Sequence, residues 1–227
     1  MDFEKGELLL INKPLRWTSF DVVKKIRGIS RAKKVGHAGT LDPLATGLLI
    51  LCTGKMTKKI DEFQASEKEY TGSFTLGITT PCFDREQPAD AEYPVSHITE
   101  EDIFKAARAF TGTIEQFPPP HSAVKINGKK AYELARKGLE VNIKSRKVNI
   151  SVFEIVSVMM PTVHFRVVCS KGTYIRTLGN DFGKYLNSGA CLESLCRTRI
   201  GNYLLTDAIT PEEFENLVKL NIDKVND

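Results

Sequence analysis

One aspartate in this chain is surrounded by residues that would hold a carboxylate in a fixed place. Asp42 lies in the run 36–47, Gly-His-Ala-Gly-Thr-Leu-Asp-Pro-Leu-Ala-Thr-Gly, and Pro43 follows it directly. Glycine permits backbone conformations with positive φ, and proline fixes its own φ. The run therefore predicts a stiff, tightly turned loop that presents a single reactive carboxylate at the start of a buried strand, 48–52. An ordinary Asp-Pro turn between two elements explains the local chemistry as well.

Hydrophobic periodicity and turn residues indicate the elements that must position this loop. Strands are predicted at 8–11, 48–52, 68–76, 147–157, 163–169 and 192–200, and helices at 18–26, 57–63, 99–110, 131–137, 173–186 and 210–220. Threonines that can cap a helix precede three of these helices, at Thr18, Thr99 and Thr210. Several neighbouring strands have no helix between them. This favours an α+β fold with a mixed, largely antiparallel sheet and flanking helices over a doubly wound parallel sheet.

Composition is that of a globular protein. The chain has 227 residues, of which 41% are hydrophobic and 26% charged, and we expect a single domain over 1–227. No apolar run approaches the length of a membrane span or a signal-peptide core, which predicts a cytoplasmic protein that does not bind a membrane. Five cysteines without a C-x-x-C pair and four scattered histidines predict no disulfide framework and no metal site.

Positive charge is concentrated in two segments, although the net charge of the chain is only +4. The segment 13–34 contains eight Lys or Arg and one Asp, and the segment 121–147 contains eight Lys or Arg and two Glu. Such clusters indicate a surface that binds a polyanion. Lysines that only solvate helix faces would give the same counts, so the charge pattern alone leaves both readings open.

The run 36–47 resembles the signature G-H-x-G-T-L-D-P-x-A-x-G of the TruB family of pseudouridine synthases, and every fixed position of that signature is present. The chain also resembles further motifs of the family at 68–70, 172–178 and 195–201, and imperfectly at 77–84. The resemblance therefore spans roughly 9–201. It implies the pseudouridine synthase fold and an isomerase that flips a uridine out of folded RNA and converts it to pseudouridine.

The resemblance implies three catalytic residues. Asp42 is the expected nucleophile, and Arg176 would hold its carboxylate through the planar fork of a guanidinium and keep it ionised. Tyr70 would stack on the target base and accept or relay the proton from C5.

Other matching residues are expected to bind the substrate. His37 would occupy the place that the flipped base has left, and Leu195 would form an apolar floor for that base. Asp84 would hold Arg176, or it is a loop acid. The neighbouring arginines of 197–199 could contact phosphate.

The segment 117–147 resembles the inserted, basic thumb loop of the bacterial branch of the family, with His121 where tyrosine is commoner. Four of its cations are expected to bind the RNA backbone: Lys125, Lys129, Lys130 and Arg136. This thumb argues for a stand-alone tRNA enzyme and against the branch that uses a guide RNA.

The resemblance thus implies a synthase that acts on the uridine of the T loop of tRNA and binds the T-arm stem-loop. No cofactor, metal, guide RNA or protein partner is expected, and the protein is expected to be a monomer. Only 26 residues follow Gly201, too few for the PUA-type RNA-binding domain that many relatives carry. Two alternatives stay open, a synthase for another RNA and a tRNA-folding chaperone that opens the T-arm elbow. Turnover on an isolated T-arm stem-loop would distinguish an enzyme from the chaperone.

Overall fold

The structure, a computed structural model, describes residues 2–119, 122, 125–126, 129–130 and 143–226. The chain divides into two compact units. The end unit comprises both chain ends, Met1–Tyr70 and Leu195–Asp227, and the middle unit comprises Thr71–Ser194. Strands β4 (Lys68–Leu76) and β12 (Ala190–Ile200) continue from one unit into the other. The single catalytic domain expected over 1–227 stays a prediction.

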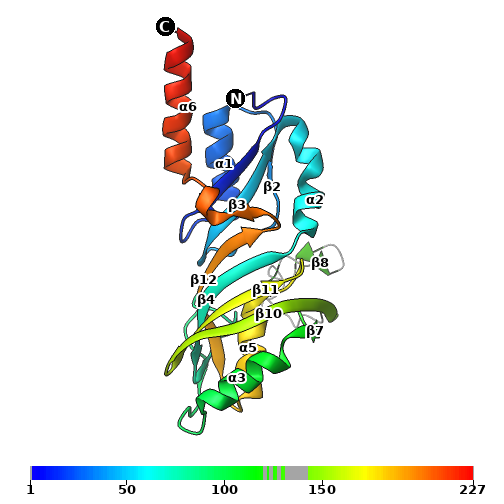
Figure 1. The fold of residues 1–227 in the computed structure, drawn as a ribbon, viewed down its shortest axis with the longest axis vertical. Coiled ribbons are helices and arrows are strands. Elements are labelled where there is room, and N and C mark those ends of the chain that lie inside the picture. The colour runs from blue at the N-terminus through cyan, green and yellow to red at the C-terminus, as the bar shows by residue number, and fades with distance from the viewer. Residues whose placement is uncertain (1, 120–121, 123–124, 127–128, 131–142, 227) are drawn as a thin grey trace. The chain divides into compact units, whose positions relative to one another are not determined.

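The end unit is a small sheet with helices packed on it (Figure 1). Besides parts of β4 and β12, its elements are β1 (Leu8–Lys13), α1 (Ser19–Ser30), β2 (Val35–His37), β3 (Ala45–Thr53), the 3-10 helix η1 (Gly54–Lys59), α2 (Ile60–Ala65), β13 (Tyr203–Leu204), the 3-10 helix η2 (Leu205–Asp207) and α6 (Pro211–Asn226). The strand order is β1–β3–β12, with β2 also paired to β3 and β13 to β12. Strands β1 and β2 run antiparallel to β3, whereas β12 runs parallel to it.

Alternation along β1 and β3 divides their side chains between the two faces of this sheet. On one face, Leu9 and Leu49 belong to a buried cluster with the apolar side of α1 and with Phe214 of α6. On the other face, Ile50 and Cys52 belong to a cluster that packs against apolar residues of η1 and α2. Helices α1 and α2 consequently cover opposite faces of β3 (Figure 1).

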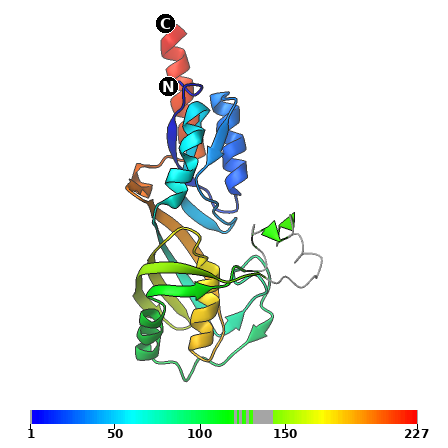
Figure 2. The same cartoon turned by 90° about the vertical axis from the view of Figure 1, so that its right-hand side faces the viewer.

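The middle unit combines a strongly bent sheet with two helices. Besides parts of β4 and β12, its elements are β5 (Ile78–Thr79), β6 (Ala91–Glu92), α3 (Glu100–Ala109), β7 (Gly112–Gln116), β8 (Lys125–Ile126), β9 (Lys129–Lys130), β10 (Arg146–Met159), β11 (Thr162–Cys169) and α5 (Ile175–Tyr185). The sheet order is β12–β4–β11–β10–β7, with β10 antiparallel to both β11 and β7. Phe74 stacks on Phe165 at 4.3 Å between ring centroids, and Phe182 of α5 lies 5.8 Å from Phe74. This aromatic core and the contacts of α3 with β10 and α5 hold both helices on the sheet (Figure 2).

The expected α+β fold with a largely antiparallel sheet is confirmed. Strand β4 has the bounds predicted for it, and the helices predicted behind Thr18 and Thr99 begin with complete capping boxes. The helix predicted at 57–63 is different, because its first part is the 3-10 helix η1 and regular α-helix begins only at Ile60. The helix predicted at 131–137 lies outside the described residues. None of the helices in the described part of the chain is long and apolar enough to cross a membrane.

Candidate active site

Asp42 lies half-buried in the loop between β2 and β3 of the end unit. Gly39 and Gly47, on either side of it, have φ values of 105° and 103°, the left-handed conformation predicted for glycines of this loop. Gly47 also has no room for a side chain, since a Cβ atom there would lie 2.4 Å from the carbonyl oxygen of Arg197. The N–H of Ala45, the first residue of β3, donates to the carbonyl oxygen of Asp42 at 3.0 Å. Asp42 therefore lies in a turn between two glycines with positive φ, directly before a buried strand.

A buried arginine on β12 holds this loop from within the end unit. Arg197 is only 1% exposed. Its Nε donates to the carbonyl oxygen of Leu48 at 2.7 Å, and its Nη2 and Nη1 donate to those of Gly39 at 3.2 Å and Thr40 at 3.5 Å. A buried guanidinium needs partners for its donors, and these carbonyls supply them. The interpretation that this arginine could contact phosphate is wrong, because its donors already hold the backbone before and after Asp42.

Arg199 is engaged too. Its Nη1 donates to the carbonyl oxygen of Gly201 at 2.9 Å, and its Nη2 pairs with Glu67 at 3.2 Å. Arg197 and Arg199 thus both bind groups within the end unit.

A buried lysine holds the other side of the loop. Lys13, the last residue of β1, has no exposed surface, and its Nζ donates to the carbonyl oxygens of Pro14 at 3.0 Å, Trp17 at 2.6 Å and Pro43 at 3.4 Å. Burial lowers the pKa of Lys13 to about 8, and attraction by the Asp42 carboxylate opposes this shift. The attraction is mutual, so it favours the charged forms of both groups. Cations from β1 and β12 therefore bind backbone carbonyls on both sides of the aspartate.

We expect Lys13→Met to change how the stability of the protein depends on pH. The pKa of Lys13 is about 8 in the folded chain against an ordinary value of 10.5, so between these values the unfolded chain binds more protons than the folded one. Stability of the wild type relative to Lys13→Met should then rise as pH increases from 8 to 10.5, by about 3 kcal/mol in total. Denaturant titrations at pH 7 and pH 10 measure both free energies of unfolding. The same comparison with the exposed Lys58→Met should show no such rise, and a constant difference for Lys13→Met would contradict the assignment.

Three further predicted site residues lie in the end unit. His37 ends β2 and is half-buried; burial lowers its pKa, so the imidazole is neutral at pH 7. Tyr70 on β4 is 9% exposed. Leu195 on β12 is also 9% exposed and pairs with Ala45, so the parallel strand pairing brings it to the end of the Asp42 loop.

Arg176 and Asp84 meet in the middle unit. Arg176 lies in the first turn of α5 and is 4% exposed, and its Nη1 lies 3.4 Å from Oδ2 of Asp84. The other carboxylate oxygen of Asp84 accepts a hydrogen bond from the N–H of Glu86 at 3.0 Å. Asp84 is 3% exposed, so it is a buried ion-pair partner of Arg176 in this structure. Asp42 and Arg176 belong to different units, and their pairing stays a prediction.

Two residues that hold the segment directly before Arg176 were not predicted. The side chain of Gln116 donates to the carbonyl oxygen of Tyr174 at 3.0 Å and accepts from its N–H at 2.8 Å, just before α5 begins. Arg146 lies over the Tyr174 ring, 4.6 Å from its centroid, and donates to the carbonyl oxygen of Gly172. A glutamine and an arginine at strand ends carry no sequence signal for such contacts, because their partners are distant in the chain.

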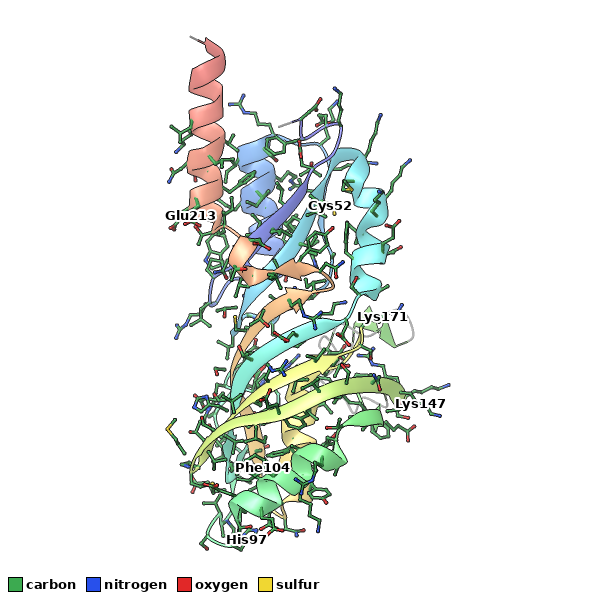
Figure 3. All side chains as sticks on the ribbon, viewed as in Figure 1. Cys52, His97, Phe104, Lys147, Lys171 and Glu213 are labelled. Carbon is green, nitrogen blue, oxygen red and sulfur yellow. The ribbon has the colours of Figure 1, made fainter. Side chains whose placement is uncertain are left out.

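The predicted thumb is described in part. Lys125 pairs with Lys130 in the two-stranded antiparallel sheet β8–β9, whose second strand also contains Lys129. Arg136 lies outside the described residues. Two exposed lysines, Lys147 on β10 and Lys171 after β11, lie at the same end of the β10–β11 strand pair (Figure 3). Within the described part of the chain, no group of three or more His, Cys, Asp or Glu could hold a metal ion.

Comparisons with known proteins agree with the signature around Asp42. Residues 27–175 match the family model described as TruB family pseudouridylate synthase (N terminal domain). A protein of Parabacteroides distasonis named tRNA pseudouridine synthase B is 53% identical, and the match covers 100% of this chain and 99% of that protein. A Clostridium kluyveri protein of the same name is 46% identical over 96% of this chain and 76% of its own length.

Two solved structures contain chains that are similar to this one. The chain is similar to one in a structure described as a Cbf5-Nop10-Gar1 complex, with a TM-score of 0.70 and 29% identity over 90% of this chain and 51% of that one. A chain in a structure of an H/ACA RNP bound to a substrate RNA containing 2'-deoxyuridine gives a TM-score of 0.71 and 26% identity, over 95% and 54% of the two chains. The present chain thus spans about half of each. Since the family model covers more than half of this chain and relatives match it from end to end, the chain belongs to the TruB family of pseudouridine synthases.

Proposed function

We propose that this protein is a tRNA pseudouridine synthase that isomerises the uridine of the T loop. The observation that carries the proposal is the Asp42 loop, in which two buried cations, Lys13 and Arg197, hold the backbone on both sides of one half-buried carboxylate. Relatives about half identical over the whole chain, named tRNA pseudouridine synthase B, support tRNA as the substrate.

The reaction breaks the bond between N1 of uracil and the ribose, rotates the base, and joins C5 to the same sugar carbon. Asp42 supplies the nucleophilic carboxylate, and Tyr70 stacks on the base and accepts or relays the C5 proton. Arg176 remains the proposed cation for that carboxylate, on the strength of its motif. No electron or external group enters the balance, since the atoms of the uridine are only rejoined, and no cofactor is required.

The uridine must leave its stack before Asp42 can reach it. We propose that His37 takes its place in the RNA. A neutral imidazole suits this role, because it can stack on neighbouring bases without burying a charge. Leu195, next to the end of the loop, would then form the apolar floor under the flipped base.

Release of tritium tests the proposed activity. When a T-arm stem-loop labelled with tritium at C5 of uridine is mixed with the protein alone, isomerisation must release one tritium for each uridine converted. We expect release at the T-loop uridine without added cofactor, guide RNA or protein. Stable binding of the stem-loop without any release would favour the chaperone alternative, and release only from another RNA would favour the other substrate.

The thumb lysines should control affinity rather than chemistry. We expect replacement of Lys125, Lys129 and Lys130 by glutamine to weaken RNA binding and to flatten its dependence on salt, by about one unit of slope for each lost phosphate contact. The single-turnover rate at saturating RNA should change much less.

A triple variant of η1 gives a matched control for charge. Lys55, Lys58 and Lys59 are exposed and lie outside both basic segments. Replacing them by glutamine should leave the salt slope close to that of the wild type. An unchanged slope for the thumb variant would show that the thumb is not an RNA clamp.

We further propose that the enzyme acts as a monomer in the cytoplasm, without a guide RNA or protein subunit. Light scattering on the protein alone and on its complex with the stem-loop would measure the mass. A dimer in the active complex would contradict this proposal.

A further inference from the structure

A groove of about 750 Å³ lies between α1 and α6 in the end unit. Six of its lining residues are an aromatic side chain and five charged ones: Trp17, Arg16, Asp21, Lys24, Lys25 and Glu215. Proteins that bind single-stranded nucleic acid combine aromatic side chains, on which bases stack, with a positively charged groove that follows the backbone.

This groove adjoins the Asp42 loop through two backbone contacts. The N–H of Arg16 donates to the carbonyl oxygen of Pro43 at 2.8 Å. The carbonyl oxygen of Trp17 accepts from Nζ of Lys13 at 2.6 Å, and the same Nζ reaches Pro43. Arg16 and Trp17 of the groove are thus linked by hydrogen bonds to Pro43, directly or through Lys13.

The acidic groups of the groove are already engaged. Glu215 pairs with Lys25 at 2.5 Å and with Lys219 at 3.0 Å, and the bond to Lys25 is the main cause that lowers the pKa of Glu215 to about 2. Asp21 accepts hydrogen bonds from Thr18 as part of the α1 capping box. Both carboxylates therefore stay ionised and occupied.

Two cations of the groove remain available. Arg16 and Lys24 are exposed, and neither makes an ion pair with any residue that the structure describes. Hydrogen bonds from Thr18 and the charge of Lys24 lower the pKa of Asp21, but Asp21 and Lys24 form no ion pair, so both cations can bind an external anion.

Arg16 also has an unfavourable backbone conformation. Its φ is 67°, in the left-handed region that costs a residue with a side chain about 1–2 kcal/mol and that glycine adopts freely. Strain of this kind is concentrated at functional sites, where the side chain is needed.

We propose that the α1–α6 groove binds the sugar–phosphate backbone of the RNA strand beside the flipped uridine. Arg16 and Lys24 bind phosphates, and Trp17 lies against a ribose or base. This proposal rests on the proposed function, because a nucleotide held at Asp42 is linked covalently to its neighbours. Its strand must leave the loop along adjacent surface, and Arg16 of the groove is hydrogen-bonded to Pro43 of that loop.

Trp17 provides a direct readout, because it is the only tryptophan in the chain. Titration with the T-arm stem-loop should change its emission and should reduce its quenching by acrylamide at least about twofold, as expected for a ring stacked on RNA. RNA that binds without protecting Trp17 from acrylamide would overturn the proposal.

The groove cations are tested with Arg16→Gly/Lys24→Ala. This variant should lose RNA affinity by about tenfold or more, as for the loss of two charge-assisted hydrogen bonds, and its salt slope should fall by one to two units. Arg16→Gly alone should melt at or above the temperature of the wild type, since the strain is relieved, while its affinity falls. Lys58→Ala/Lys59→Ala is the control of equal charge and should bind like the wild type.

Neutral phosphates identify the contact. Stem-loops that carry a single methylphosphonate at successive positions around the target uridine should bind the wild type more weakly at the one or two contacted positions. At those positions the Arg16→Gly/Lys24→Ala variant should bind neutral and normal RNA equally. If no position shows this difference while tritium is still released from the stem-loop, the groove proposal is overturned and the proposed function stands. If the protein neither binds nor converts the stem-loop, both are overturned.

Discussion

Asp42→Asn should abolish pseudouridine formation while the protein still folds and binds the T-arm stem-loop. The amide matches the carboxylate in size but carries no charge and is not a comparable nucleophile. We expect the single-turnover rate of tritium release to fall by at least about 10³-fold, the scale seen when a nucleophile is removed. Affinity for the stem-loop and the denaturation midpoint should stay close to those of the wild type.

A matched change at an exposed acid separates catalysis from general effects of charge. Asp61 lies in the first turn of α2 and is exposed, and Asp61→Asn should release tritium at the rate of the wild type. Near-normal turnover by Asp42→Asn would show that another group is the nucleophile.

Arg197→Met should destabilise the protein and slow catalysis together. The variant leaves the carbonyl oxygens of Leu48, Gly39 and Thr40 without the donors that they have now. The bond to Leu48 is buried, whereas those to Gly39 and Thr40 are partly buried. A buried acceptor without a donor costs about 1–3 kcal/mol and one that water can reach costs less, so we expect a loss of about 2–3 kcal/mol in the free energy of unfolding. Urea denaturation measures this loss, and single-turnover tritium release at saturating RNA measures the effect on the Asp42 loop.

Arg199→Met is the control, two residues along the same strand. Arg199 makes one backbone hydrogen bond and a partly exposed ion pair with Glu67, so its loss should cost about 1 kcal/mol. Arg197→Lys restores a charge and some donors and should fall between the wild type and Arg197→Met, which keeps the test informative if the methionine variant does not fold. Equal stability of Arg197→Met and Arg199→Met would contradict the role of Arg197.

Features with local causes were predictable from the sequence. The capping boxes at Thr18 and Thr99 depend on residues three apart, and β4 has a compact run of strand-forming residues at 68–76. The turned loop around Asp42 follows from its glycines and proline, and two of those glycines do have positive φ. In each case the residues that determine the conformation lie beside one another in the chain.

Features that depend on distant partners were not predictable. Lysine and arginine are rarely buried, so an exposed position is the sound expectation for Lys13 and Arg197. Their burial depends on partners such as Pro43, 30 residues from Lys13, and Gly39, 158 residues from Arg197. The short β5–β6 pair joins Ile78 to Glu92 within a segment predicted mostly as loop. No local pattern encodes these pairings, because they form only when the sheet is assembled.

The assembly of the end unit from both ends of the chain has a consequence during synthesis on the ribosome. Translation delivers the N-terminal half first, so the middle unit, a continuous segment, can fold before the end unit is complete. Asp42, the proposed nucleophile, is made early, yet Arg197 and the parallel strand that carries it emerge more than a hundred residues later. A nascent chain that lacks this strand should therefore be unable to modify tRNA, and activity should begin only after Arg197 and its strand have left the ribosome.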